Sequence, residues 1–127
     1  MASEPALFLA LLDPARYHFD PLGLWYFGTA ALVLLCGALV LYWERGSGVS
    51  RLFATLCLVF GLHGAARGVT RLVADPQLLQ AIWRWDYLLV LIAVPLVYHF
   101  TAVMLRADER RALIIRASWV AGVIFAF

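Results

Sequence analysis

Four long apolar runs, separated by short polar segments, organise this chain. The predicted membrane spans cover residues 24–43, 52–73, 83–105 and 112–127. A transmembrane helix needs about 20 mostly apolar residues, and the first three runs meet that requirement. The stretch from Ile82 to Leu105 is the strongest, because it carries no formal charge from Tyr87 onward and has aromatic residues at its front edge. Such aromatic edges are typical of membrane–water interfaces.

The polar segments predict loops and one surface segment. Residues 1–23 are expected to lie along the interface, with a helical turn over 6–12 that ends at Asp13-Pro14. The acidic start of this segment and its lack of a small-residue cleavage site argue against a cleavable signal peptide. Residues 44–51 predict a loop in which Ser50 caps the next helix, and residues 76–81 predict a second loop.

The composition strengthens this interpretation. Of 127 residues, 65% are hydrophobic and 14% are charged, whereas a soluble domain is nearer half apolar and a quarter charged. We therefore expect an all-α integral membrane protein: a helical bundle over 24–127 with three full transmembrane helices and the start of a fourth. Cys36 and Cys57 lie inside apolar runs as small hydrophobes. The net charge of +2 gives no reason to expect a nucleic-acid partner.

Arginine positions predict the orientation. Arg45 and Arg51 lie in the loop after the first span, and Arg106 opens an arginine-rich loop after the third span. Basic loops favour the cytoplasmic side of a membrane, so the N-terminus is expected outside. The fourth run is too short to cross a bilayer, and we therefore expect the chain to be part of a longer protein.

Charged residues inside the spans are the first candidate site. His63, Arg67 and Arg71 fall at i, i+4 and i+8, on one face of the second span. Asp86 begins the third span, so Arg67, Arg71 and Asp86 are expected to meet near the outer surface. They form either an ion pair with arginines reaching the headgroups or a site for an anionic ligand.

Two histidines are the second candidate site. Counted from the cytoplasmic ends of their spans, His63 and His99 differ in depth by about 8 Å at 1.5 Å per residue. Two helical histidines at similar depth could ligate a haem or a pigment. The alternative is that each histidine is hydrogen-bonded within the helical bundle.

Pro95 is a structural candidate, and the remaining polar residues form no recognisable catalytic or metal-binding motif. Pro95 removes one backbone hydrogen bond near the middle of the third span, so it is a candidate for a hinge or for a packing bend. The chain has no phosphate-binding glycine loop, no metal-ligand spacing and no converging catalytic set. We therefore expect no enzyme activity, no metal and no resident cofactor in this stretch.

Several stretches resemble a known membrane region. The first span follows DPLGLWYF and ends in LVLYWER, the second reads RLFATLCLVFGLHGAARGVTRLVADP, and IWRWDY leads into LLVLIAVPLVYHFTAVML. Together they resemble the N-terminal seven-helix membrane region of bacterial sensor histidine kinases and of some cyclases. The resemblance covers about residues 13–127 and implies the first four of seven helices, in a bacterial inner membrane. It supplies no ligand or catalytic motif here.

The resemblance implies a sensory or anchoring input region of a bacterial signalling protein. Its partners would be the lipid bilayer, other transmembrane helices and a second copy of the chain as a homodimer. The main alternative is an accessory or structural subunit of a respiratory or photosynthetic complex, touching a haem or pigment through His63 or His99. A third class is a transporter or channel that uses Arg67 and Arg71 for anions.

Overall fold

The structure, a computed structural model, describes residues 13–44 and 46–126. A short 3-10 helix precedes four α-helices: η1 (Pro14–Arg16), α2 (Pro21–Trp43), α3 (Gly48–Leu72), α4 (Pro76–Met104) and α5 (Ala112–Ala126). Helices α2, α3 and α4 are each long and apolar enough to cross a membrane, whereas α5 is a shorter apolar helix. The predicted all-α fold class is confirmed, and the protein is a multi-pass membrane protein.

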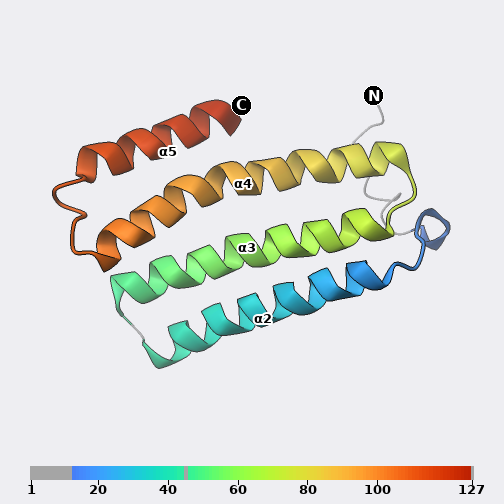
Figure 1. The fold of residues 1–127 in the computed structure, drawn as a ribbon, viewed down its shortest axis with the longest axis horizontal. Helices are drawn as coiled ribbons and strands as arrows, with labels where there is room; N and C mark the ends of the chain where they lie inside the picture. The colour runs from blue at the N-terminus through green and yellow to red at the C-terminus, as the bar shows by residue number, and fades with distance from the viewer. Residues whose placement is uncertain (1–12, 45, 127) are drawn as a thin grey trace.

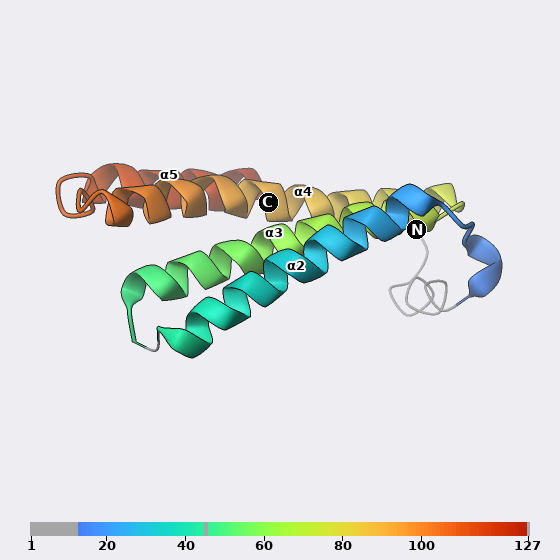
Figure 2. The same cartoon turned by 60° about the horizontal axis from the view of Figure 1, so that its bottom comes forward.

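The four α-helices lie side by side in chain order, in one open row (Figure 1). Within the described residues, each helix contacts only the helices that precede and follow it. Figure 2 shows α2 and α3 inclined to the layer formed by α4 and α5. Helices α2 and α5 therefore lie at the two edges, where exposed apolar side chains such as Trp25 and Leu113 suit contact with lipid.

Small residues bring α2 and α3 close together. A Cβ atom on Gly37 would lie 2.6 Å from the Cys57 Cβ atom, and one on Gly61 would lie 2.5 Å from Leu34 Cγ. Both distances are far inside van der Waals contact, so an added side chain at either position would force the neighbouring helix or side chain to move. Gly37 therefore allows α3 to approach α2 closely. Membrane helices often pack in this way, because lipid provides no hydrophobic force between them.

Apolar packing joins α3, α4 and α5. Val59, Ala93 and Leu96 form a buried cluster, against which Trp119 of α5 also packs. Pro95 is buried in this region, and α4 continues through it from Pro76 to Met104. A Cβ atom on Gly122 of α5 would lie 3.3 Å from Pro95 Cγ. In this structure Pro95 therefore serves packing between α4 and α5.

Two predicted helix starts are wrong, because in both cases the capping residue lies earlier in the chain than expected. The loop expected over 76–81 is the first part of α4, because the Asp75 side chain accepts from the Gln77 backbone N–H at 2.8 Å and caps the helix. Proline suits the first position of a helix, so Asp75-Pro76 starts α4 as well as ending α3. Ser47, rather than Ser50, caps α3. Ser50 is buried, and its hydroxyl donates to Glu44 Oε2 at 2.6 Å.

The described part of the predicted surface segment is attached to the turn between α3 and α4. The His18 N–H donates to the Leu72 carbonyl at 2.8 Å, and the Ala74 N–H donates to the Arg16 carbonyl at 2.8 Å. The Arg16 guanidinium also pairs with the Asp75 carboxylate. The Gln77 backbone N–H is the main cause that lowers the pKa of Asp75. The helical turn expected over 6–12 lies outside the described residues.

Candidate functional site

A buried carboxylate joins α3 to α4. Asp86 of α4 is only 4% exposed. Its Oδ1 atom lies 2.6 Å from His63 Nδ1, and its Oδ2 atom lies 3.2 Å from Arg67 Nε. His63 and Arg67 are four residues apart on α3, so they present both partners on the face that meets α4. We call these three residues the Asp86 cluster.

A second contact from α4 holds Arg67. The Arg67 guanidinium carbon lies 5.1 Å from the centroid of the Trp83 ring, which is within the range of a cation–π interaction. Trp83 and Asp86 are one helical turn apart, so a single face of α4 provides both the ring and the carboxylate. Arg67 is therefore held between a π face and a negative charge, while its side chain stays 39% exposed.

The Asp86 cluster lies at membrane depth. His63 is about 22 Å from the Gly48 end of α3 and about 14 Å from the Leu72 end, at 1.5 Å per residue. Unpaired charge is costly inside a hydrocarbon core about 30 Å thick. Arg67 neutralises Asp86, so a neutral His63 leaves the cluster without net charge. A carboxylate oxygen only accepts hydrogen bonds, so Nδ1, the His63 nitrogen that faces Asp86, is the nitrogen that donates.

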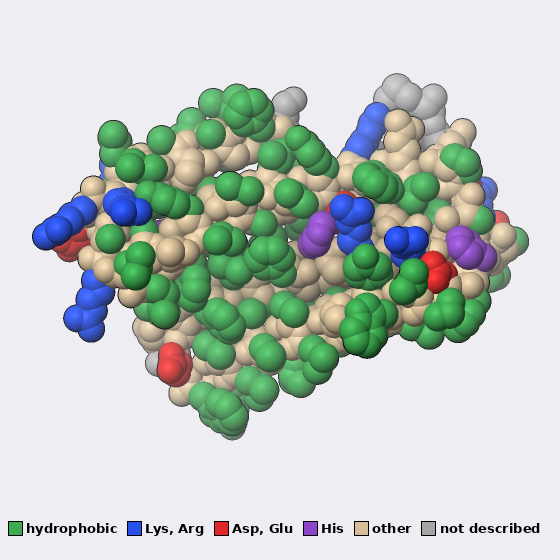
Figure 3. All heavy atoms as spheres, viewed as in Figure 1, with side chains coloured by type: hydrophobic (Ala, Val, Ile, Leu, Met, Phe, Trp, Pro, Cys, Tyr) green, Lys and Arg blue, Asp and Glu red, His purple; other side chains and the backbone are tan. Residues whose placement is uncertain are grey.

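The polar side chains of α3 are visible on the surface of the molecule. In Figure 3 a histidine and arginine side chains gather over α3, on a face that hydrophobic side chains otherwise cover. The predicted meeting of Arg67 with Asp86 is confirmed. Arg71 is exposed and pairs with no carboxylate in the described ranges, so the predicted trio is reduced to a pair. The place of Arg71 is taken by His63, which the sequence prediction had left outside the trio.

The two histidines lie at different depths. His63 is level with Asp86, and His99 is about 20 Å further along α4 at 1.5 Å per residue. The expected difference of about 8 Å is therefore wrong, and both imidazoles cannot ligate one iron. Among the described residues, no three His, Cys, Asp or Glu side chains are grouped so as to hold a metal ion.

A groove between α3 and α4 begins beside the Asp86 cluster. Its volume is about 410 Å³. Its lining residues come from both helices and are, apart from one, apolar: Val59, Phe60, His63, Leu89, Val90, Ala93, Val94 and Val97. His63 is the one polar side chain that faces this space. The Asp86 cluster is therefore open on one side to an apolar cavity.

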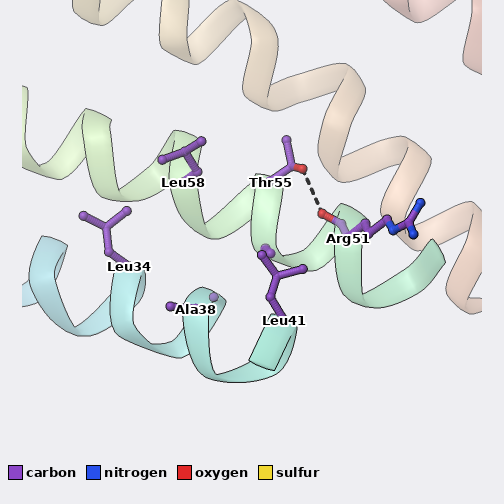
Figure 4. A pocket seen from close by; sticks show the side chains of 8 residues that line it. Leu34, Ala38, Leu41, Arg51, Thr55 and Leu58 are labelled. Carbon is purple, nitrogen blue, oxygen red and sulfur yellow. Dashed lines mark hydrogen bonds between the residues drawn. The ribbon is translucent and has the colours of Figure 1, made fainter. Parts of the chain in front are cut away.

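A second groove, between α2 and α3, offers less chemistry (Figure 4). It has a volume of about 380 Å³ and is lined mainly by aliphatic side chains such as Leu34 and Leu58. The Thr55 hydroxyl donates to the Arg51 carbonyl at 2.8 Å. The Arg51 guanidinium points away from the leucines in Figure 4. Arg51 and Thr55 are the polar residues that line this groove, and both come from the part of α3 next to the turn after α2.

Comparison of the chain with family models, with curated proteins and with solved structures gave no match.

Proposed function

We propose that this chain is the membrane-embedded input region of a bacterial signalling protein, in the inner membrane with its N-terminus outside. The observation that carries the proposal is the Asp86 cluster, which places paired charges between two membrane-spanning helices. Intramembrane ionisable residues are costly and usually functional. The resemblance of the sequence to the membrane region of sensor kinases supports the same assignment.

The geometry offers a way to transmit a signal. Helix α4 is held to α3 by the Asp86 cluster at one level and by Val59, Ala93 and Leu96 at another, with open space beside them. Since the helices form an open row, α4 has no contact with α2 that would resist a shift. A stimulus that binds one packing of α3 against α4 more tightly than another shifts the population between them.

The coding sequence beyond Phe127 tests the function. Further membrane spans followed by a cytoplasmic kinase, cyclase or comparable output domain support an input region. A stop codon at that point, or further sequence without any output domain, contradicts it.

The orientation is tested with single cysteines in a parent carrying Cys36→Ala and Cys57→Ala. Gln77→Cys probes the exposed start of α4, beside the turn that follows α3, and Glu109→Cys probes the turn between α4 and α5. A membrane-impermeant thiol reagent should label the variant at 77 in cells with a permeabilised outer membrane. It should label the variant at 109 only after lysis. The reverse pattern contradicts the proposed orientation, and the parent without added cysteine gives the background.

An accessory subunit of a respiratory or photosynthetic complex is the second candidate. It is favoured by the apolar side chains exposed along α2 and α5, which could bind partner helices. A single histidine, His63 or His99, would then touch the cofactor. An absorption band of haem or pigment in the purified protein that disappears on His63→Leu or His99→Leu supports this candidate. A colourless protein contradicts a cofactor role for both histidines.

A further inference from the structure

The groove beside the Asp86 cluster has one polar residue, His63, in an otherwise apolar wall. His63 Nδ1 is bonded to Asp86 at 2.6 Å, and His63 Nε2 has no partner among the described residues. No fully buried side-chain nitrogen or oxygen in those residues lacks a partner, so Nε2 is open to the space around it. His63 is one of the residues that line the groove, so the groove is part of the space around the imidazole ring.

The proton on His63 decides what Nε2 can bind. A neutral imidazole has one donor nitrogen and one acceptor nitrogen. In that neutral form the proton lies on Nδ1, which faces Asp86, and the Nε2 atom presents a lone pair. A carboxylate that orients a histidine in this way is a common device for presenting the opposite nitrogen to a ligand. The groove therefore favours a molecule that donates a hydrogen bond.

The remaining walls favour a flat ring with an apolar tail. Phe60 precedes His63 by one turn of α3 and gives the groove an aromatic face. Val94 and Val97 of α4 continue the apolar wall away from the histidine. A volume of about 410 Å³ lies in the range of small-molecule sites. The depth of His63 means that such a molecule would enter from the bilayer.

We propose that this groove binds a lipid-soluble quinol, with one ring hydroxyl donating to His63 Nε2 and the ring packed against Phe60. The oxidised quinone has only carbonyl acceptors, which would face the acceptor Nε2 without a hydrogen bond. The site therefore distinguishes the reduced from the oxidised form of the same molecule. Asp86 is a positioning residue, because it fixes the proton of His63 and does not line the groove.

Other membrane molecules suit the groove less well. A phospholipid needs a cation for its phosphate, and no arginine lines the groove; Arg67, one turn from His63, is engaged with Asp86 and Trp83. A plain acyl chain would leave Nε2 in an apolar contact without a partner, which costs free energy. A quinol satisfies the nitrogen and covers the apolar wall together.

This inference names the stimulus of the proposed input region, and its biological meaning rests on that function. Binding is measured on the full-length protein in lipid nanodiscs by titration calorimetry. The probes are a decyl-tailed benzoquinol kept reduced by ascorbate and the matching quinone. We expect the quinol to bind about tenfold more tightly than the quinone, since the quinone would leave the Nε2 acceptor without a hydrogen-bond donor. Equal affinity for the two forms, or no quinol binding, overturns the proposal.

Two substitutions locate the site. His63→Leu should weaken quinol binding at least tenfold, and Val94→Trp should block the groove without touching the Asp86 cluster. His99→Leu and Val123→Trp are the matched controls and should bind quinol like the natural protein. Quinol binding that survives both His63→Leu and Val94→Trp overturns the assignment, as does a tightly held phospholipid that quinol cannot displace.

A third substitution tests the role of Asp86. In Asp86→Asn the amide can donate to Nδ1, so the His63 proton can move to Nε2 and the preference for quinol should fall or reverse. A merely structural role would weaken both probes equally, and that result contradicts the positioning role. Quinol binding without any change in signalling output would refute the proposed function alone. Loss of binding with the predicted membrane orientation intact would refute this inference alone.

Discussion

The interfaces on the two sides of α3 are built differently. Towards α2, the contact relies on shape: Gly37 and Gly61 allow the backbones to approach until a single added carbon would collide. Towards α4, the contact relies on charge: Asp86 binds His63 and Arg67, and an open groove remains beside them. The first interface has little freedom to change, because close packing tolerates few alternatives. The second can change when its charges or its groove are occupied differently.

The largest effect is expected at the charged interface. Asp86→Ala leaves Arg67 without its counter-ion and His63 without its acceptor. Breaking a buried pair by removing one partner costs about 3–5 kcal/mol, and we expect a loss in the free energy of unfolding of that order. Reversible unfolding in mixed micelles, followed by circular dichroism, measures it.

A double substitution separates two costs of Asp86→Ala: the cost of leaving the Arg67 cation unpaired and the cost of losing the volume of the Asp86 side chain. Adding Arg67→Met to Asp86→Ala removes the unpaired cation, and we expect part of the lost stability to return. A cost below about 1 kcal/mol for Asp86→Ala, which is the value of an exposed pair, would show that the cluster is not a buried interaction.

The shape-based interface gives the next effect. Gly37→Ala places a carbon where Cys57 Cβ already lies. Overpacking typically costs about 1–3 kcal/mol, so unfolding should become easier by that amount. Gly28 lies on the same helix with no atom within 4 Å of an added Cβ. Gly28→Ala should therefore stabilise α2 by up to about 1 kcal/mol, the helix propensity difference. Equal effects of the two substitutions would contradict close packing at Gly37.

A smaller effect is expected where Trp83 meets Arg67. Trp83→Leu removes the cation–π contact but keeps the ion pair with Asp86. Such contacts contribute about 0.5–2 kcal/mol, and we expect a loss of about 1 kcal/mol. Trp85 is 71% exposed and makes no cation–π contact with any residue that the structure describes. Trp85→Leu is therefore the matched control, and thermal unfolding of both variants should separate them. Indistinguishable midpoints would mean that the Trp83 ring does not hold Arg67.

The two interfaces were not equally predictable from the sequence. The apolar runs locate three membrane-spanning helices, and the face shared by His63 and Arg67 follows from helical spacing. The position of α3 along the axis of α4 does not follow from the sequence. Each residue by which a predicted helix boundary is wrong shifts the expected height of a side chain by about 1.5 Å. Reading Asp75-Pro76 only as a break set the predicted start of the third span too late, at residue 83 instead of residue 76.

An error at the opposite end of the spans explains the missed contact, because the histidine depths were counted from the cytoplasmic ends and α3 begins at Gly48, four residues before the predicted residue 52. His63 and His99 were expected at similar depth, whereas His63 is level with Asp86. Which side chains meet across an interface depends on the axial offset between the two helices, and no local sequence pattern indicates that offset. The cap could have been recognised, since aspartate before proline is also the start signal of a helix.

The smallest effect concerns the end of the charged interface, where Asp75 caps α4. The Gln77 N–H, followed by the Leu78 N–H and Arg16, lowers the pKa of this carboxyl group. A lowered folded pKa contributes stability that is fully present above the unfolded value of about 3.9. That stability is lost as pH falls through the folded value. Asn at this position still caps a helix but carries no charge. The difference in unfolding free energy between the natural protein and Asp75→Asn should therefore be constant near neutral pH and shrink below about pH 4. A difference that grows on acidification would contradict this account.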